Sequence, residues 1–162
     1  LKALIRSGHR TNIFSARFLP ATNCGYTVSC SGDGCVILTD VEREDTHGNF
    51  VFGCHVSTTY EVGVFPNDPH TFLSCGEDGT VRWFDRRVKQ RCSPCQDDVI
   101  VECRRAVGAI DVNPCRPWQL AAGCSDGTVR LYDMRQLSKP CEGSFASMDL
   151  FILKAGTSVQ QL

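Results

Sequence analysis

Long apolar runs are missing from this sequence of 162 residues. No stretch approaches the roughly 18 apolar residues that a membrane-spanning helix requires. Residues 1–30 also lack the apolar core of a signal peptide. We therefore expect a soluble intracellular protein that has no membrane as a partner.

A surplus of charge of either sign is missing too. The 17 basic residues nearly balance the 18 acidic residues, and the formal net charge is -1. Such a chain has no overall field that would gather nucleic acid, so we expect no direct binding to nucleic acid. One local basic cluster lacks the interleaved aromatic residues of a single-strand site and is interpreted as a solvated loop. It comprises Arg86, Arg87, Lys89 and Arg91.

Motifs of catalysis are absent as well. The sequence contains no glycine-rich loop of the kind that cradles phosphates. Histidine and aspartate occur, but the repeat described below already explains their spacing, so a nucleophile and base pair has no independent support. We expect no enzyme activity, no cofactor and no metal site.

Cysteine, in contrast, is abundant, with 11 residues. In a small secreted chain this number would indicate a disulfide framework. Several of these cysteines stand at the ends of strands, however, where a small apolar thiol packs well, and we expect reduced, structural thiols. Cys92-Ser93-Pro94-Cys95 has the spacing of zinc ligands without a second pair. Two free thiols are expected there, with a metal-binding or redox module as the alternative.

Three similar stretches contain an Asp-Gly turn followed by alternating apolar residues. Asp-Gly predicts a tight hairpin turn because glycine takes positive φ without a Cβ clash. The turn aspartates Asp33, Asp78 and Asp126 stand 45 and 48 residues apart, a period typical of propeller blades. A proline precedes each turn by twelve or thirteen residues, at Pro20, Pro66 and Pro114. The whole unit is therefore repeated.

Each unit reads as four short strands, because Gly, Pro, Asn and Asp stand at every break between apolar runs. The predicted fold is all-β, a propeller segment of about three four-stranded blades. Propellers close with four to eight blades, so we expect the segment to be incomplete alone. The predicted divisions are residues 1–7 (outer strand of a preceding blade), 8–54 and 55–103 (whole repeats), 104–137 (partial repeat) and 138–162 (divergent, irregular tail).

The Gly8-His9 pair, the Asp-Gly turns and the closing Phe84-Asp85 and Tyr132-Asp133 pairs resemble the WD-repeat family. The resemblance implies a buried hydrogen-bond network in each blade, formed by a His, a Ser, the turn Asp and an aromatic residue. Thr39, Phe84 and Tyr132 stand where the family usually has Trp. The implied network residues are His9, Ser29 and Asp33 in the first unit, His55, Ser74 and Asp78 in the second, and Asp126 in the third, where Ala122 replaces the Ser.

Residues 8–15, 66–69 and 71–85 resemble more closely the WD-repeat substrate receptors of cullin-4 RING E3 ubiquitin ligases. This resemblance implies a role in ubiquitin conjugation and a partner, the damaged-DNA-binding adaptor protein of these ligases. Some members also act as transcription coactivators for nuclear receptors. We therefore expect nuclear and cytoplasmic localisation. The alternative is a generic WD-repeat scaffold or coactivator module without a ligase link.

Receptors of this class carry the pattern W-D-x-R at the end of a third strand and use it to meet the adaptor. Phe84-Asp85-Arg86-Arg87 and Tyr132-Asp133-Met134-Arg135 match the pattern with a changed aromatic residue, whereas Thr39-Asp40-Val41-Glu42 does not. An Arg just beyond a rigid strand can grip partner oxygens in two places. The resemblance implies adaptor binding by Asp85, Arg87, Asp133 and Arg135. Alternatively, the two arginines are solvated loop residues paired with their aspartates.

Overall fold

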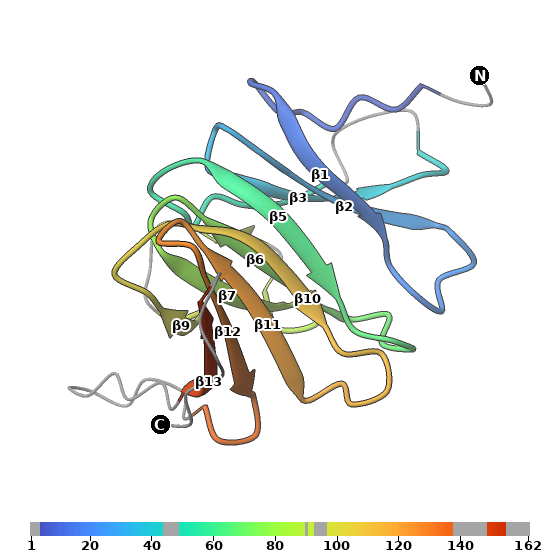
Figure 1. Ribbon diagram of the computed structural model, residues 1–162. Helices are drawn as coiled ribbons and strands as arrows, with labels where there is room; N and C mark the ends of the chain where they lie inside the picture. Colours follow the sequence, from blue (N-terminus) through green and yellow to red (C-terminus); the bar gives the residue numbers. More distant parts are fainter. Residues whose placement is uncertain (1–3, 44–48, 90, 93–96, 138–148, 155–162) are drawn as a thin grey trace.

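Three small β-sheets make up the protein (Figure 1). The computed structural model describes residues 4–43, 49–89, 91–92, 97–137 and, for the backbone alone, 149–154. Within these ranges every regular element is a strand, and no helix is long and apolar enough to span a membrane. The strands are β1 (Ile13–Phe18), β2 (Tyr26–Ser31), β3 (Val36–Asp40), β4 (Phe50–Phe52), β5 (Thr59–Val64), β6 (Thr71–Gly76), β7 (Thr80–Asp85), β8 (Arg91–Cys92), β9 (Val99–Glu102), β10 (Val107–Val112), β11 (Gln119–Cys124), β12 (Thr128–Asp133) and β13 (Asp149–Lys154).

Each sheet is an antiparallel meander of four consecutive strands. The orders are β1-β2-β3-β4 with β8 added at the edge, β5-β6-β7-β9, and β10-β11-β12-β13. In all three sheets the register between the first and second strands shifts at the same place, near the start of the first strand. The prediction of an all-β propeller segment with about three four-stranded blades is confirmed.

The ends of the chain differ in what they add to the blades. Residues 4–7 belong to no strand, and residues 1–3 lie outside the described part. In the segment 138–162, Asp149–Lys154 pairs with β12 as β13 and supplies the fourth strand of the third blade. The rest of that segment lies outside the described residues.

The Asp-Gly turns require glycine at each repeat. Gly34, Gly79 and Gly127 have φ values of 76°, 77° and 79°, which lie in the left-handed region that L side chains rarely adopt. A Cβ at Gly79 would also clash with the carbonyl oxygen of Cys103. The turn of one blade is therefore packed directly against the chain that leads into the next blade.

The hydrophobic core lies between the faces of neighbouring sheets. Between the first and second blades, Phe52, Phe72 and Phe84 form an aromatic cluster with ring centroids 4.9 to 5.4 Å apart. Between the second and third blades, buried residues such as Leu73, Val101 and Leu120 form the second core. Every residue of β6 is buried, because the second blade is covered on both faces.

The three residues that stand where the WD-repeat family usually has Trp differ in their contacts. Phe84 and Tyr132 are buried at these positions with exposures of 1% and 0%. The Tyr132 hydroxyl lies 3.5 Å from the Cys103 sulfur. Thr39 is also buried, but its hydroxyl has no hydrogen-bond partner among the described residues. The first blade therefore lacks both the aromatic bulk and a partner for the polar group that replaced it.

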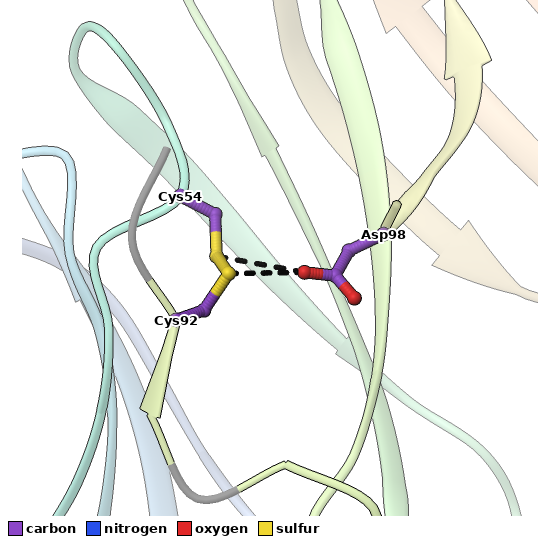
Figure 2. A group of neighbouring side chains, drawn as sticks. All are labelled: Cys54, Cys92 and Asp98. Atoms are coloured by element: carbon purple, nitrogen blue, oxygen red, sulfur yellow. Dashed lines mark hydrogen bonds between the residues drawn. A yellow bond between two sulfur atoms is a disulfide. The ribbon is translucent and has the colours of Figure 1, made fainter. Parts of the chain in front are cut away.

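One expectation about the cysteines is wrong. Cys54 and Cys92 form a disulfide, with their Cα atoms 5.8 Å apart (Figure 2). The basic cluster that ends at Arg91 is interpreted from the sequence as a solvated loop, but Arg91 belongs to β8, which pairs with β4 in parallel and places Cys92 opposite Phe52. Cys95 lies outside the described residues. Seven other cysteines in the described part are free, namely Cys24, Cys30, Cys35, Cys75, Cys103, Cys115 and Cys124.

The aromatic cluster provides a test of the packing between blades. We expect Phe72→Ala to lower the free energy of unfolding of the full chain by about 3–5 kcal/mol, because it removes a fully buried ring and leaves a cavity. Urea unfolding followed by fluorescence measures this change. Val88→Ala is the control, since Val88 is 76% exposed and its loss should change the value by less than about 0.5 kcal/mol. Equal effects of the two changes would contradict the packing described here.

Candidate protein-docking site

The end of β7 carries an ion pair between a buried carboxylate and an exposed guanidinium. Arg87 donates to Asp85 from Nε and Nη2, at 3.0 Å to Oδ1 and 2.6 Å to Oδ2. Its backbone N–H also donates to Asp85 Oδ1 at 2.9 Å. The two side chains thus form a two-pronged pair in which Nη1 of Arg87 is not used by Asp85.

The end of β12 repeats this pair. Arg135 donates to Asp133 Oδ1 from its backbone N–H at 3.0 Å and from Nε at 2.9 Å, and its Nη2 donates to Oδ2. The guanidinium also lies over the Trp118 ring, with Cζ 4.8 Å from the ring centroid. Stacking on an aromatic face further restricts the orientation of the guanidinium. Both Asp–Arg pairs stand where the third strand of a blade ends. We call them the rim pairs.

Burial divides each rim pair into two parts. The side chains of Asp85 and Asp133 are 6% and 7% exposed, whereas those of Arg87 and Arg135 are 61% and 62% exposed. Hydrogen bonds from Arg87 lower the pKa of the Asp85 carboxyl, and those from Arg135 lower the pKa of Asp133. Each aspartate is therefore an anion that fixes the orientation of an exposed arginine guanidinium.

The first blade does not repeat the pair, as the sequence predicts. Glu42 stands at the Arg position, and its backbone N–H donates to Asp40 at 3.0 Å. The next residue, Arg43, reaches Asp40 through a contact of 3.5 Å from Nε to Oδ2. Its side chain is 64% exposed. This arginine offers a charge at the same edge without the two-pronged geometry.

An apolar groove lies beside Arg135. Its volume is about 520 Å³. The lining residues come from the second and third blades: Phe65, Trp83, Ile100, Pro117, Trp118, Met134, Arg135 and Leu137. The repeat pattern and the motifs in the sequence do not predict this groove. Its two tryptophans, the whole tryptophan content of the chain, are the signal that could have indicated it, since Trp is enriched at protein interfaces.

The predicted network residues of the second blade are brought together. His55 Nδ1 lies 3.0 Å from Asp78 Oδ2, and His55 Nε2 lies 2.7 Å from Ser74 Oγ. Thr80 donates to Asp78 Oδ1 from its backbone N–H at 3.0 Å and from its hydroxyl at 2.8 Å. The His55 side chain is 0% exposed, so the network is sealed within the fold.

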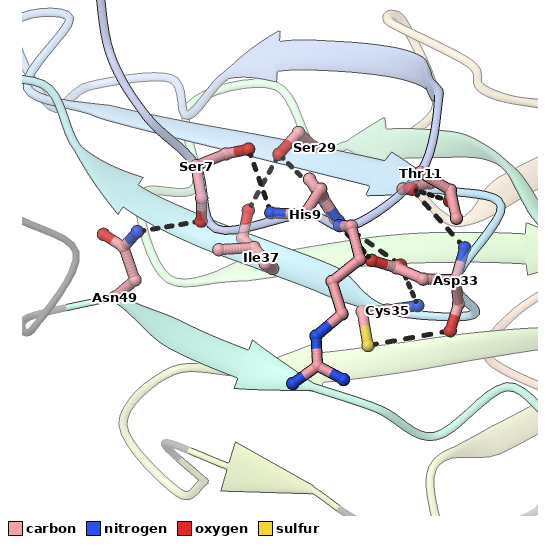
Figure 3. A network of polar contacts seen from close by, with 10 residues as sticks. Ser7, His9, Thr11, Ser29, Asp33, Cys35, Ile37 and Asn49 are labelled. Carbon is pink, nitrogen blue, oxygen red and sulfur yellow. Dashed lines mark hydrogen bonds and ion pairs between the residues drawn. The ribbon is translucent and has the colours of Figure 1, made fainter.

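The first blade has the same network with longer contacts (Figure 3). His9 Nδ1 lies 3.4 Å from Asp33 Oδ1, and His9 Nε2 lies 3.0 Å from Ser29 Oγ. The third blade has no such histidine contact among the described residues. There Asp126 accepts a hydrogen bond at 3.0 Å from the backbone N–H of Thr128 and pairs with Arg130 at 3.4 Å.

The turn aspartates differ in how strongly their surroundings favour the anion. Burial would raise the pKa of Asp78, but hydrogen bonds from His55 and Thr80 outweigh it and hold this pKa far below the ordinary value. Burial would raise the pKa of Asp33 as well, but backbone hydrogen bonds from Arg10 and Cys35, together with His9, outweigh it and lower this pKa. The second blade thus contains the most strongly stabilised carboxylate of the two networks.

Known proteins resemble this chain over most of its length. The family model described as WD domain, G-beta repeat, matches residues 46–85 and 99–133. The human DDB1- and CUL4-associated factor 6 is 54% identical over 145 residues, which are 88% of this chain and 17% of that protein. That relative is the nuclear receptor interacting protein, and residues 8–15, 66–69 and 71–85 of this chain resemble its sequence. That resemblance is confirmed.

Two more distant relatives are also named as WD-repeat proteins. The human WD and tetratricopeptide repeats protein 1 is 33% identical over 82% of this chain and 20% of its own length. The fission yeast WD repeat protein iqw1 is 32% identical over 84% of this chain and 18% of its own length. The chain therefore spans about a fifth of the length of these curated relatives.

The network of the second blade predicts a defined response to pH. The pKa of Asp78 lies below its ordinary value of 3.8 in the folded protein, so its stabilising effect is present above about pH 4 and is lost as the pH falls through the folded-state pKa. We expect Asp78→Asn to lower the free energy of unfolding by about 1–3 kcal/mol near pH 7. Urea unfolding across pH should show this gap closing below about pH 4.

Asp126→Asn is the matched control for this measurement. Asp126 occupies the same turn of the third blade, but its side chain is 30% exposed and is not paired with a histidine. A smaller loss of stability is expected from this change. If the two variants lose equal stability at neutral pH, the buried histidine pair does not set the stability of the second blade.

Proposed function

Because the chain belongs to the WD-repeat family, we propose that it is a non-enzymatic scaffold and part of the substrate receptor of a cullin-4 RING E3 ubiquitin ligase. In this role it docks on the adaptor protein DDB1, and other surfaces of the whole protein select the target. The proposal rests on one observation, which is that two adjacent blades each carry an Asp–Arg rim pair. The name of its human relative records association with DDB1 and CUL4.

The rim pairs suit docking because their geometry is set before a partner arrives. Ordering an arginine side chain at an interface normally costs about 0.5–1.5 kcal/mol of conformational free energy. Here Asp85 and Asp133 already accept hydrogen bonds from Nε and Nη2 of each guanidinium, and each accepts a third from the arginine's backbone N–H. The outward Nη1 of each arginine can then donate to carbonyl or carboxylate oxygens of the partner.

The groove beside Arg135 adds an apolar component to the same surface. Strong interfaces combine a buried apolar anchor with charged groups around it. Trp118 takes part in both, since it lines the groove and supports the Arg135 guanidinium. An apolar side chain of the adaptor that enters the groove would bring its neighbouring backbone oxygens close to Arg135.

The Ser74, His55 and Asp78 contacts do not support catalysis. Their order of hydrogen bonds resembles that of a hydrolase triad, but the His55 side chain is 0% exposed and Ser74 is 0% exposed. No substrate can reach a hydroxyl that is fully covered by protein. We therefore assign this network to the stability of the blade and propose a protein without enzyme activity.

The resemblance to the nuclear receptor interacting protein supports a second part of the proposal. A component of a cullin-4 ligase that also assists nuclear receptors would be found in the nucleus and in the cytoplasm. The WD-repeat segment would serve both roles as a rigid platform, with the rim assigned to the adaptor. Nuclear receptors would then bind elsewhere in the protein.

Co-purification and binding measurements with DDB1 test the docking. We expect Arg87→Ala and Arg135→Ala each to weaken binding of the full chain by about tenfold, and the double variant by about a hundredfold, because each removes a preorganised donor from the interface. Arg43→Ala is the matched control and should bind like wild type. Equal binding by the double variant and wild type would instead favour a scaffold without a ligase link.

The stacked tryptophan gives a second test at the same surface. We expect Trp118→Ala to weaken DDB1 binding by about tenfold, because the groove loses its wall and Arg135 loses its support. Binding is measured by calorimetry, and circular dichroism checks the fold of the variant. Undiminished affinity of a folded Trp118→Ala variant would remove the groove from the docking surface.

A further inference from the structure

Three side chains that could bind a metal meet where the chain passes between the first and second blades (Figure 2). Cys54 follows β4, Cys92 belongs to β8, and Asp98 comes just before β9. Their two sulfurs and a carboxylate oxygen all lie within 4.8 Å of one another. The Cys54 side chain is fully buried, and Asp98 is 8% exposed. None of these residues belongs to the rim pairs or to the histidine networks.

The carboxylate faces both sulfurs at close range. Asp98 Oδ2 lies 3.1 Å from the Cys92 sulfur and 3.7 Å from the Cys54 sulfur. A disulfide sulfur carries no proton, so in the oxidised form an anionic oxygen meets two sets of lone pairs. The contact becomes favourable when a proton or a cation lies between the oxygen and the sulfurs. The arrangement thus suits the reduced cysteines better than the disulfide.

The distances match those around a tetrahedral zinc ion. Zn²⁺ binds thiolate sulfur at about 2.3 Å and carboxylate oxygen at about 2.0–2.2 Å. An oxygen and a sulfur on the same tetrahedral ion are then about 3.5 Å apart. The two observed oxygen–sulfur distances, 3.1 Å and 3.7 Å, lie on either side of this value. Once the disulfide is reduced, the sulfurs can separate to the distance that the ion requires.

The charges around the cluster also fit a divalent cation. Two thiolates and one carboxylate carry three negative charges, which exceed the charge of Zn²⁺ by one. Lys89 supplies a further positive charge, with Nζ 2.8 Å from Asp98 Oδ1. This contact leaves Oδ2 directed at the sulfurs and fixes the carboxylate from its outer side, as partners of metal ligands commonly do. Soft thiolate ligands favour zinc over magnesium or calcium.

We propose that Cys54, Cys92 and Asp98 form a zinc site in the reduced protein, and that the Cys54–Cys92 disulfide is its oxidised, metal-free form. A dithiol reductant supplies two electrons and two protons to the disulfide and itself becomes a disulfide. Zn²⁺ then binds the two thiols as thiolates, and their two protons pass to solvent. The fourth position on the ion is left to a ligand outside this trio.

The site would join the blades in both of its states. Either the disulfide or the metal connects the end of β4 to the segment between β7 and β9, so the first and second blades stay linked across their seam. The proposal concerns a largely buried cluster whose three ligands are not part of the rim pairs, and it holds or fails independently of DDB1 docking.

Metal analysis of the full chain tests the proposal. The protein is purified under a phosphine reductant, loaded with Zn²⁺ and desalted, and its zinc is measured by mass spectrometry. We expect stoichiometric zinc in wild type and in Cys115→Ser, a control that removes an exposed free thiol. Cys54→Ser should lose the bound zinc. If reduced wild type holds no more zinc than Cys54→Ser, the site does not exist.

A folded variant outside the ligand set provides a second test. We expect Lys89→Gln to weaken zinc binding by about 10–100-fold, because the carboxylate loses its outer partner. Co²⁺ in place of zinc should give a thiolate-to-metal charge-transfer band in wild type, and titration of this band compares the two affinities. A cobalt band that persists in Cys54→Ser, or an unchanged affinity in Lys89→Gln, contradicts the proposed geometry.

Oxidation tests the link between the metal and the disulfide. Treatment of the zinc-loaded chain with oxidised glutathione should release the metal as the Cys54–Cys92 bond forms, which peptide mapping detects. Retention of zinc in chains that contain this bond would show that the two sulfurs are not its ligands.

Discussion

Face-to-face packing of the second sheet against its two neighbours is the constraint on which the rest of the structure depends. The Phe52, Phe72 and Phe84 rings fill one side, and Leu73, Val101 and Leu120 fill the other. This packing fixes the second blade relative to the third. Because the rim pairs follow β7 and β12, the same packing fixes the separation and direction of Arg87 and Arg135.

Each blade has an aspartate near the start and another at the end of its third strand, and the two have different roles. At the turn between the second and third strands, Asp78 meets a histidine that is fully buried, and the pair stabilises the blade. At the far end of the third strand, Asp85 is equally buried but meets an exposed arginine. An ion pair with one exposed partner adds little stability, so its value lies in presenting the arginine to another protein.

The sequence predicts the repeat and the strands because these depend on local patterns, and its resemblance to the WD-repeat family implies the network residues. Asp-Gly turns need a left-handed glycine, and strands alternate with period two, so both are visible along the chain. The disulfide and the groove were missed because they depend on packing between segments far apart. Cys54 and Cys92 meet only because β8 pairs with β4. Trp118 supports Arg135 only because the turn before β11 lies beside the end of β12.

Hydrogen–deuterium exchange of the full chain with and without DDB1 tests the central claim most directly, because it maps the docking surface without changing any residue. We expect slower exchange in residues 85–89, 116–118 and 133–137, which contain the rim pairs and part of the groove beside Arg135. The Asp-Gly turns at Asp33, Asp78 and Asp126 lie at the opposite ends of the blades and should exchange as in the free protein. Protection of those turns, with no change at the rim, would contradict the assignment of DDB1 docking to the rim pairs.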